Sequence, residues 1–126
     1  MFTAIGSGMS KNRPFTDKLR FALAGWRHAW RSEVNFRRQV WIGGAAVLVV
    51  IAVRAPLVWL ALTVLCIGMV WALELANTAV EELVDLVSPE RRVVAGKIKD
   101  LMAGAVLFAA LASLVVGVCA LWVALG

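Results

Sequence analysis

The sequence has few of the residues with which proteins build metal or nucleic-acid sites: one His, two Cys and no Tyr among 126 residues. Cys66 and Cys119 lie within apolar runs, without metal-ligand spacing and without a neighbouring His. We therefore expect both to pack as small hydrophobic side chains. The net charge of +5 could suit nucleic acid, but the sequence has no aromatic-interleaved RNA-binding motif and no zinc pattern. Its basic residues flank hydrophobic runs, which favours lipid headgroups or nucleotide phosphates as partners, and no nucleic acid.

Charged residues are scarce as well, at 17% of the chain, whereas 62% is hydrophobic and the mean hydropathy is +0.85. Soluble domains are usually about 45–50% apolar, so the composition predicts a membrane protein, and the length predicts one domain. The first 20 residues do not show the pattern of a cleaved signal peptide, so we expect the N-terminus to be retained. Residues 1–14 are expected to be disordered.

Long uncharged runs predict the membrane-spanning helices. These runs lie at 39–53, 55–73 and 101–126. A helical span needs about 20 residues, so the first run has to begin near Asn35 in order to cross. We predict an all-α membrane domain over residues 15–126, with three transmembrane helices at about 35–53, 56–86 and 98–125. Such a chain has little interior for polar groups, so we also expect self-association.

The connections between these spans share the positive charge unequally. Eight of the 13 Lys and Arg residues precede residue 39, four lie in the expected connection at 87–100, and Arg54 lies in the other connection. By the positive-inside rule, the N-terminus and the 87–100 connection face the cytoplasm, and the C-terminus lies outside. Arg54 belongs to an Arg-Ala-Pro stretch that predicts a tight turn, since proline disfavours helical geometry in the residue before it. Ser88-Pro89 predicts a helix stop at the start of the other connection.

Residues 15–38 predict a helix at about 15–34 that lies on the membrane surface. Apolar side chains recur every three or four residues with basic residues between them, which is typical of an interfacial amphipathic helix. These apolar positions are Phe15, Leu19, Leu23, Trp26 and Trp30. A membrane anchor would explain the pattern, but Glu33 is one of only two acids before residue 74. We expect His28, which lies among basic residues, to contact lipid headgroups rather than to act as a catalyst.

Four polar residues follow a helical spacing at the end of the second span: Glu74, Asn77, Glu81 and Asp85. Residues three, seven and eleven positions apart share one helix face, so these side chains can converge on one site. Glu82 lies about a hundred degrees from Glu81 around the helix, and we expect it to be a solvated neighbour. An ionised carboxylate within the bilayer costs about 2.5–3.5 kcal/mol on insertion scales. Glu74 alone could form an interhelical hydrogen bond, but several adjacent anions require a cation or a proton to compensate them.

This face suggests different roles for a deep and a shallow carboxylate. Glu74, which is deeper in the apolar run, could accept a proton. Glu81, which is nearer water, could bind a hard cation such as Mg²⁺ together with phosphate. Glu33 and the Lys99-Asp100 pair are the candidates to supply further ligands and positive charge from other segments.

The sequence of residues 74–90, ELANTAVEELVDLVSPE, together with Lys99-Asp100-Leu-Met-Ala-Gly104, closely resembles the small integral-membrane kinases of the prokaryotic diacylglycerol kinase and undecaprenol kinase family. Glu33, in WRSEVNF, fits an acidic position near the N-terminus of that family. The resemblance covers about residues 15–125. It implies a lipid kinase of the bacterial inner membrane that uses ATP and Mg²⁺. It also implies a homotrimer, with active sites between subunits at the cytoplasmic face.

The resemblance implies roles for individual residues. Glu74 is similar to the general base that takes the proton from the lipid hydroxyl, and Glu33 and Glu81 are similar to the carboxylates that hold Mg²⁺ on the ATP phosphates. The nucleotide-binding positions that it implies are Glu33, Asn77, Glu81, Glu90, Arg91, Arg92, Lys99 and Asp100. The positions that it implies for contact with the lipid substrate are Trp30, Glu74, Asp85 and Met102.

The sequence departs from the family pattern beside Glu90. Members that prefer diacylglycerol often carry Tyr-His after this acid, whereas this chain has Arg91-Arg92. Residues 83–90 and 103–107 look more like the undecaprenol kinase branch, although Met102 stands where that branch usually has a small residue. The lipid acceptor, diacylglycerol or undecaprenol, therefore stays open. The chain has no Walker A sequence, glycine-rich kinase loop or HRD/DFG set, so nucleotide binding is expected to be of this family's own kind.

Two other classes of protein compete with a lipid kinase. A small proton-coupled multidrug exporter also uses a membrane carboxylate, but its acid lies well inside a span, whereas these acids cluster at an expected cytoplasmic edge beside a basic connection. A structural membrane oligomer could use the acids for packing alone.

Overall fold

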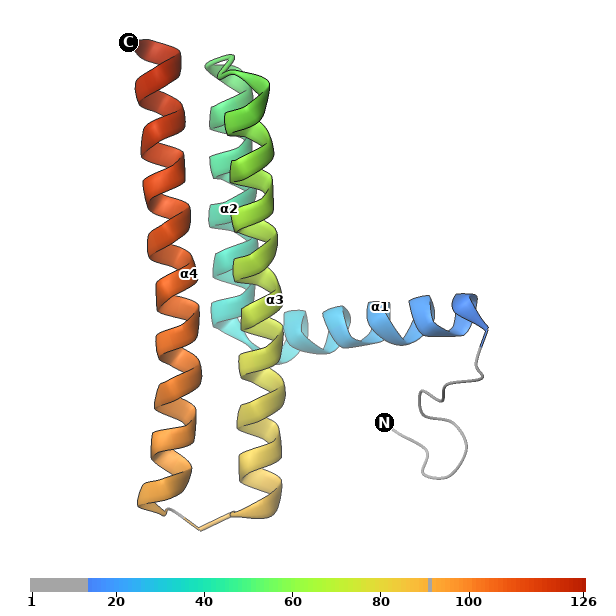
Figure 1. The fold of residues 1–126 in the computed structure, drawn as a ribbon. Helices are drawn as coiled ribbons and strands as arrows, with labels where there is room; N and C mark the ends of the chain where they lie inside the picture. The colour runs from blue at the N-terminus through green and yellow to red at the C-terminus, as the bar shows by residue number, and fades with distance from the viewer. Residues whose placement is uncertain (1–13, 91) are drawn as a thin grey trace.

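The computed structural model describes residues 14–90 and 92–126, and in this part the chain is entirely helical (Figure 1). The helices are α1 at Phe15–Ser32, α2 at Val34–Ala52, α3 at Leu57–Val87 and α4 at Val93–Leu125. The expected disorder of residues 1–14 concerns residues outside the described part, apart from Pro14. The nucleotide-binding role expected for Arg91 also concerns a residue outside it.

Three of these helices, α2, α3 and α4, are long enough and apolar enough to cross a membrane, as expected. They have 19, 31 and 33 residues, which at about 1.5 Å per residue gives lengths of roughly 28, 46 and 50 Å. The hydrocarbon core of a bilayer is about 30 Å thick. Helix α2 therefore matches the core, whereas α3 and α4 each exceed it by several turns. In Figure 1, α3 and α4 continue together past the level at which α1 joins α2.

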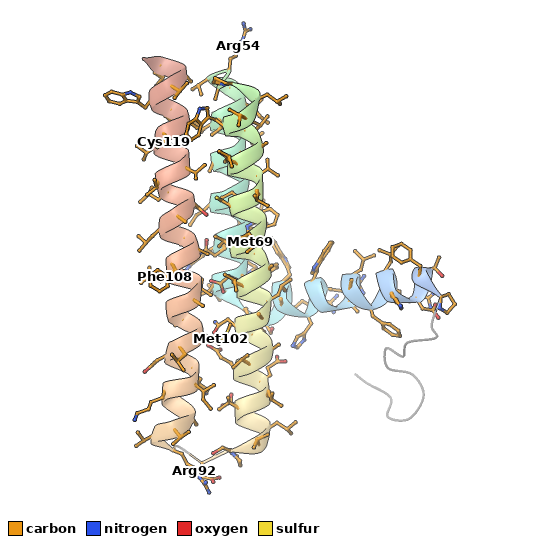
Figure 2. The ribbon with its side chains drawn as sticks, viewed as in Figure 1. Arg54, Met69, Arg92, Met102, Phe108 and Cys119 are labelled. Atoms are coloured by element: carbon orange, nitrogen blue, oxygen red, sulfur yellow. The ribbon has the colours of Figure 1, made fainter. Side chains whose placement is uncertain are left out.

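The turn between α2 and α3 is tight, as the Arg-Ala-Pro stretch predicts. Arg54 adopts a positive φ of 57°, and Pro56 directly precedes the first residue of α3. Arg54 and Arg92 lie at opposite ends of the bundle (Figure 2). The apolar spans thus have a cationic residue beyond each end.

The second connection is shorter than the sequence suggests. It runs from residue 88 to residue 92, and α4 begins at Val93, five residues before the expected start near 98. The uncharged run that predicts this span begins only at residue 101, and such a run marks the part of the helix that enters the hydrocarbon rather than the end of the helix. Lys97, Lys99 and Asp100 belong to helical turns that extend the apolar run.

The bundle is held mainly by packing of α3 against α4, and α2 packs chiefly against α3. Gly43 of α2 marks a close approach, because a Cβ atom there would lie 2.6 Å from Cγ2 of Ile67. Beside it, Nε1 of Trp71 donates a hydrogen bond of 3.0 Å to the carbonyl oxygen of Gln39. Many large apolar side chains remain exposed, including those of Phe108 and Trp122. Lipid or another subunit must cover so much apolar surface.

Helix α1 leaves the bundle sideways and lies across the direction of the other three helices (Figure 1). It makes sparse contact with α2 and α3, and Ala29 is its buried residue. Its large apolar side chains, such as Phe15 and Leu23, are exposed. Glu33 separates α1 from α2 in an extended conformation, with φ −121° and ψ 109°, and so forms the corner between them.

Candidate active site

Glu74 is the buried acid of the chain's polar face. Glu74 is 6% exposed and lies where the long apolar run of α3 ends. Glu81 lies about two turns further along α3. Glu33 lies at the corner between α1 and α2, and α1 makes contact with α3. The structure therefore brings three of the acids that the sequence singles out to the same end of the spans.

Asn77 lies between Glu74 and Glu81 along α3. Its Nδ2 donates a hydrogen bond of 3.4 Å to Oε1 of Glu81, and its Oδ1 is buried without a hydrogen-bond partner. A buried acceptor that lacks a partner costs about 1–3 kcal/mol. A donor or a cation beside Asn77 would remove this cost, so this amide oxygen is suited to a ligand.

The polar face crosses the edge of the apolar region. With Leu57 placed at one edge of a 30 Å hydrocarbon core, Glu74 lies roughly 26 Å along the helix, just inside the other edge. Glu81 lies about 10 Å further along, on the polar side. The side chain of Glu81 is part-buried, and that of Asp85 is exposed. A buried carboxylate next to hydrated ones suits a reaction between a group that belongs to a lipid and a second reactant that arrives from water.

Asp85 and Lys99 form a direct contact between α3 and α4. Nζ of Lys99 lies 2.7 Å from Oδ1 of Asp85. Asp100, the next residue, lines a shallow hollow on α4 together with Lys97 and Gly104. Lys99 and Asp100 are adjacent in the sequence, but within one chain they belong to different surroundings.

The remaining nucleotide-binding candidates lie at the α3–α4 connection. Glu90 and Arg92 form an exposed ion pair, with 2.7 Å between Oε1 and Nη2. Ser88 donates a side-chain hydrogen bond to the carbonyl oxygen of Glu90 at 3.4 Å. The end of α3 at Val87 is about 20 Å along the helix from Glu74. Within one chain, the expected nucleotide-binding residues are therefore spread along the polar part of the bundle rather than gathered at one point.

The expected lipid-contacting residues also lie on several elements. Trp30, near the end of α1, has its ring centroid 6.3 Å from that of Trp41 on α2. It lines a cavity of about 570 Å³ with residues of α2 and α3 that include Trp71 and Leu75. The cavity lies between α1, α2 and α3, and Leu75, which lines it, directly follows Glu74 in the sequence. Met102 is half-buried in α4.

His28 and Glu82 form a contact between α1 and α3. Nε2 of His28 lies 2.6 Å from Oε1 of Glu82, so this carboxylate has a specific partner on another helix. Glu82 is about half exposed, as expected of a solvated side chain, but it also has this specific partner, which the sequence does not indicate. The expected contact of His28 with lipid headgroups stays a prediction. The two residues are 54 positions apart, and no local pattern links them, because the contact depends on how α1 crosses α3.

The residues present fit a magnesium ion in part. Among residues 14–90 and 92–126, no three His, Cys, Asp or Glu side chains of one chain converge closely enough to hold a metal by themselves. Mg²⁺, however, is usually bound by one or two carboxylates together with substrate phosphates and water. Glu33 and Glu81 supply two carboxylates, and the unpartnered Oδ1 of Asn77 is a further oxygen of the kind that Mg²⁺ prefers.

Three long apolar helices with carboxylates at one end of the spans define a multi-pass membrane protein with a polar site at its membrane edge. A model of the prokaryotic diacylglycerol kinase family matches residues 20–121. The chain therefore belongs to this family of lipid kinases, as the motifs in its sequence predict.

Individual relatives agree with this membership. A diacylglycerol kinase of Synechocystis is 38% identical over 103 residues, which cover 81% of this chain and 59% of that protein. An undecaprenol kinase of Bacillus subtilis is 32% identical over 106 residues, covering 84% of this chain and 85% of that protein. A diacylglycerol kinase of Escherichia coli is 28% identical over 109 residues, covering 81% and 84%. The chain thus spans under two thirds of the Synechocystis protein and most of the other two.

Proposed function

We propose that the protein transfers the γ-phosphoryl group of ATP, with Mg²⁺, to the hydroxyl of a membrane lipid alcohol at the cytoplasmic face of the inner membrane. The observation that carries the proposal is the placement of Glu74, buried where the apolar run of α3 meets the polar face that Asn77 and Glu81 continue. A lipid hydroxyl can reach a carboxylate at this depth while the lipid stays in the membrane. Membership of the prokaryotic diacylglycerol kinase family supports the same reaction.

Glu74 accepts the proton of the lipid hydroxyl as the oxygen attacks the phosphorus atom. Burial suits this role, because water is largely excluded and the lipid hydroxyl is the group that this carboxylate meets. Glu33 and Glu81 would hold Mg²⁺, which would supply positive charge against the phosphates. Asn77 orients Glu81 through its Nδ2 hydrogen bond. Lys99, Asp100, Glu90 and Arg92 position the nucleotide.

We also propose that the working unit is a homotrimer in which a neighbouring chain completes each site. The separate surroundings of Lys99 and Asp100 within one chain and the large exposed apolar surface support this arrangement. Helix α1 lies at the membrane interface on the cytoplasmic side, as its exposed apolar and basic residues and its sideways course support. The C-terminus then lies outside.

The acceptor lipid is diacylglycerol or undecaprenol, and relatives of this chain carry the names of both kinases. The two products are phosphatidic acid and undecaprenyl phosphate. Purified protein in mixed micelles with radiolabelled ATP and each lipid in turn tests the reaction. We expect label in one lipid, and loss of the label when Mg²⁺ is chelated. Labelling of neither lipid, with substrate uptake driven by a proton gradient in vesicles, would establish an exporter instead.

A further inference from the structure

We propose that His28 and Glu82 are a positioning pair that holds α1 across α3 and thereby keeps Glu33 beside Glu74. The proposal rests on the proposed function for its kinetic consequences. Its geometric content, a contact between α1 and α3 of the same chain, does not depend on that function.

Apart from the ring contact of Trp30 with Trp41 of α2, helix α1 has little other attachment to the bundle. Its contacts with α2 and α3 are sparse, Ala29 is its buried residue, and its large apolar side chains are exposed. Burial of apolar surface within the chain therefore does little to fix the direction of this helix. A side-chain contact that joins α1 to α3 has a correspondingly large influence on where α1 lies.

The His28–Glu82 contact has the geometry for this task. The distance of 2.6 Å between Nε2 and Oε1 is that of a short charge-assisted hydrogen bond. Nε2 is the donor and the carboxylate the acceptor, whether the imidazole is neutral with its proton on Nε2 or is protonated. The two side chains are 55% and 52% exposed, so the contact is made at the surface, where it can constrain α1 without a cost of burying charge.

The contact lies close to the corner that carries Glu33. His28 lies on α1, five residues before Glu33 at the corner, and Glu82 directly follows Glu81 on α3. A second contact stiffens the corner itself, since the guanidinium of Arg37, in the first turn of α2, donates to the carbonyl oxygens of Trp30 and Arg31 at the end of α1. The corner therefore moves with α1, and the His28–Glu82 contact sets its distance from the acids of α3.

The proposed pair acts on the metal-binding carboxylate and not on the lipid hydroxyl. Loss of the contact lets Glu33 move away from Glu81, so the KM for Mg–ATP is expected to rise roughly two- to fivefold, the size expected for a half-exposed pair. The KM for the lipid and the turnover at saturating Mg–ATP change little. A purely structural role would instead lower kcat and stability together.

Steady-state kinetics of His28→Ala, Glu82→Ala and the double variant test this role. We expect the same rise in the KM for Mg–ATP in all three, since each removes the same contact. His28→Gln, whose Nε2 can still donate, and the exchange of the two residues in His28→Glu with Glu82→His should restore the parent value. Lys18→Ala, which removes a charge from α1 without touching α3, is the matched control and should behave as the parent.

Cross-linking tests the geometry independently of any activity. In a background in which Cys66 and Cys119 are changed to Ala, His28→Cys with Glu82→Cys is treated with a short bifunctional thiol reagent in micelles. We expect cross-linking within one chain, seen as a monomer on a denaturing gel whose two labelled peptides are joined. Cross-links between chains, or none at all, would overturn the proposal, as would an unchanged KM for Mg–ATP in an active His28→Ala variant. An inactive parent protein that still cross-links within the chain would refute the kinase and leave the geometry standing.

Discussion

Lys99 and Asp85 join α4 to α3 through a contact of 2.7 Å between Nζ and Oδ1. The two side chains are 37% and 67% exposed, and pairs of this kind contribute only about 0.2–1 kcal/mol to stability. The contact therefore contributes little to the stability of the protein. The contact holds an ammonium group at a defined place near the polar end of the bundle, where the proposed nucleotide binds.

Lys99→Met is expected to raise the KM for ATP by roughly ten- to hundredfold, the size of a charge-assisted hydrogen bond of about 1.5–3 kcal/mol. Asp85→Asn should raise it by less, because it loosens the ammonium group without removing it. Neither change should lower the free energy of unfolding by more than about 1 kcal/mol. Kinetics and denaturation in micelles measure both quantities.

Lys97→Met is the matched control for this prediction. Lys97 carries the same charge two residues earlier and lines the hollow on the α4 surface. We expect its KM for ATP to stay within about twofold of the parent. Equal losses in Lys97→Met and Lys99→Met would mean that net charge, and not the position of Lys99, attracts the nucleotide.

Glu74→Gln removes the proposed base and keeps the size and much of the polarity of the side chain. We expect kcat to fall roughly 10²- to 10⁴-fold, the usual contribution of a general base, while the affinity for Mg–ATP measured by titration stays close to that of the parent. Thr78→Val is a suitable control, because the Thr78 hydroxyl is buried one turn further along and bonds only to the backbone oxygen of Glu74. If Glu74→Gln loses Mg–ATP binding instead, this residue is a metal ligand and the base lies elsewhere.

Glu33→Ala and Glu81→Ala should mainly weaken the binding of Mg–ATP. Each change removes one of the two proposed metal ligands, so we expect the affinity for Mg–ATP to fall at least roughly tenfold. Loss of a group that only orients a metal ligand already lowers metal affinity by about this factor or more. Raised Mg²⁺ should recover part of the activity. Titration of Mg²⁺ at fixed ATP measures the effect. Affinities equal to the parent's would move the metal site away from these carboxylates.

Much of this arrangement is predictable from the sequence, because it depends on local patterns. Uncharged runs predict the three long helices, and the Arg54-Ala55-Pro56 stretch predicts the tight turn. The helical spacing of Glu74, Asn77 and Glu81 predicts that they share a face. The uncharged run predicts a start for α4 that is later than Val93, since an apolar run shows where a helix enters the hydrocarbon and not where the helix begins.

The sequence does not predict the side-chain contacts between distant segments of the chain. Nothing near His28 indicates Glu82, and nothing near Lys99 selects Asp85 rather than a nucleotide as its partner. Such contacts depend on the angle at which α1 crosses α3 and on the register of α3 against α4. These quantities are set by packing of the whole bundle, to which Gly43, Ile67 and many other positions contribute.

The close approach of α2 and α3 at Gly43 provides a test of this packing. A Cβ atom at Gly43 would lie 2.6 Å from Cγ2 of Ile67 and 3.0 Å from Nε1 of Trp71, the group that donates to the carbonyl oxygen of Gln39. Gly43→Ala therefore forces α2 away from α3 or displaces both side chains. We expect the free energy of unfolding to fall by about 1–3 kcal/mol, the usual cost of overpacking.

Gly44→Ala is the matched control, because a Cβ atom at Gly44 meets nothing within 4 Å. Alanine favours the helix over glycine by up to about 1 kcal/mol, so this change should leave the stability equal or slightly higher. Thermal unfolding of both variants in the same micelles, followed by tryptophan fluorescence, compares them directly. Because the N-terminus of α2 carries Glu33 beside α3, Gly43→Ala should also weaken Mg–ATP binding, whereas Gly44→Ala should not. Equal behaviour of the two variants would show that the α2–α3 approach at Gly43 is not tight in the folded protein.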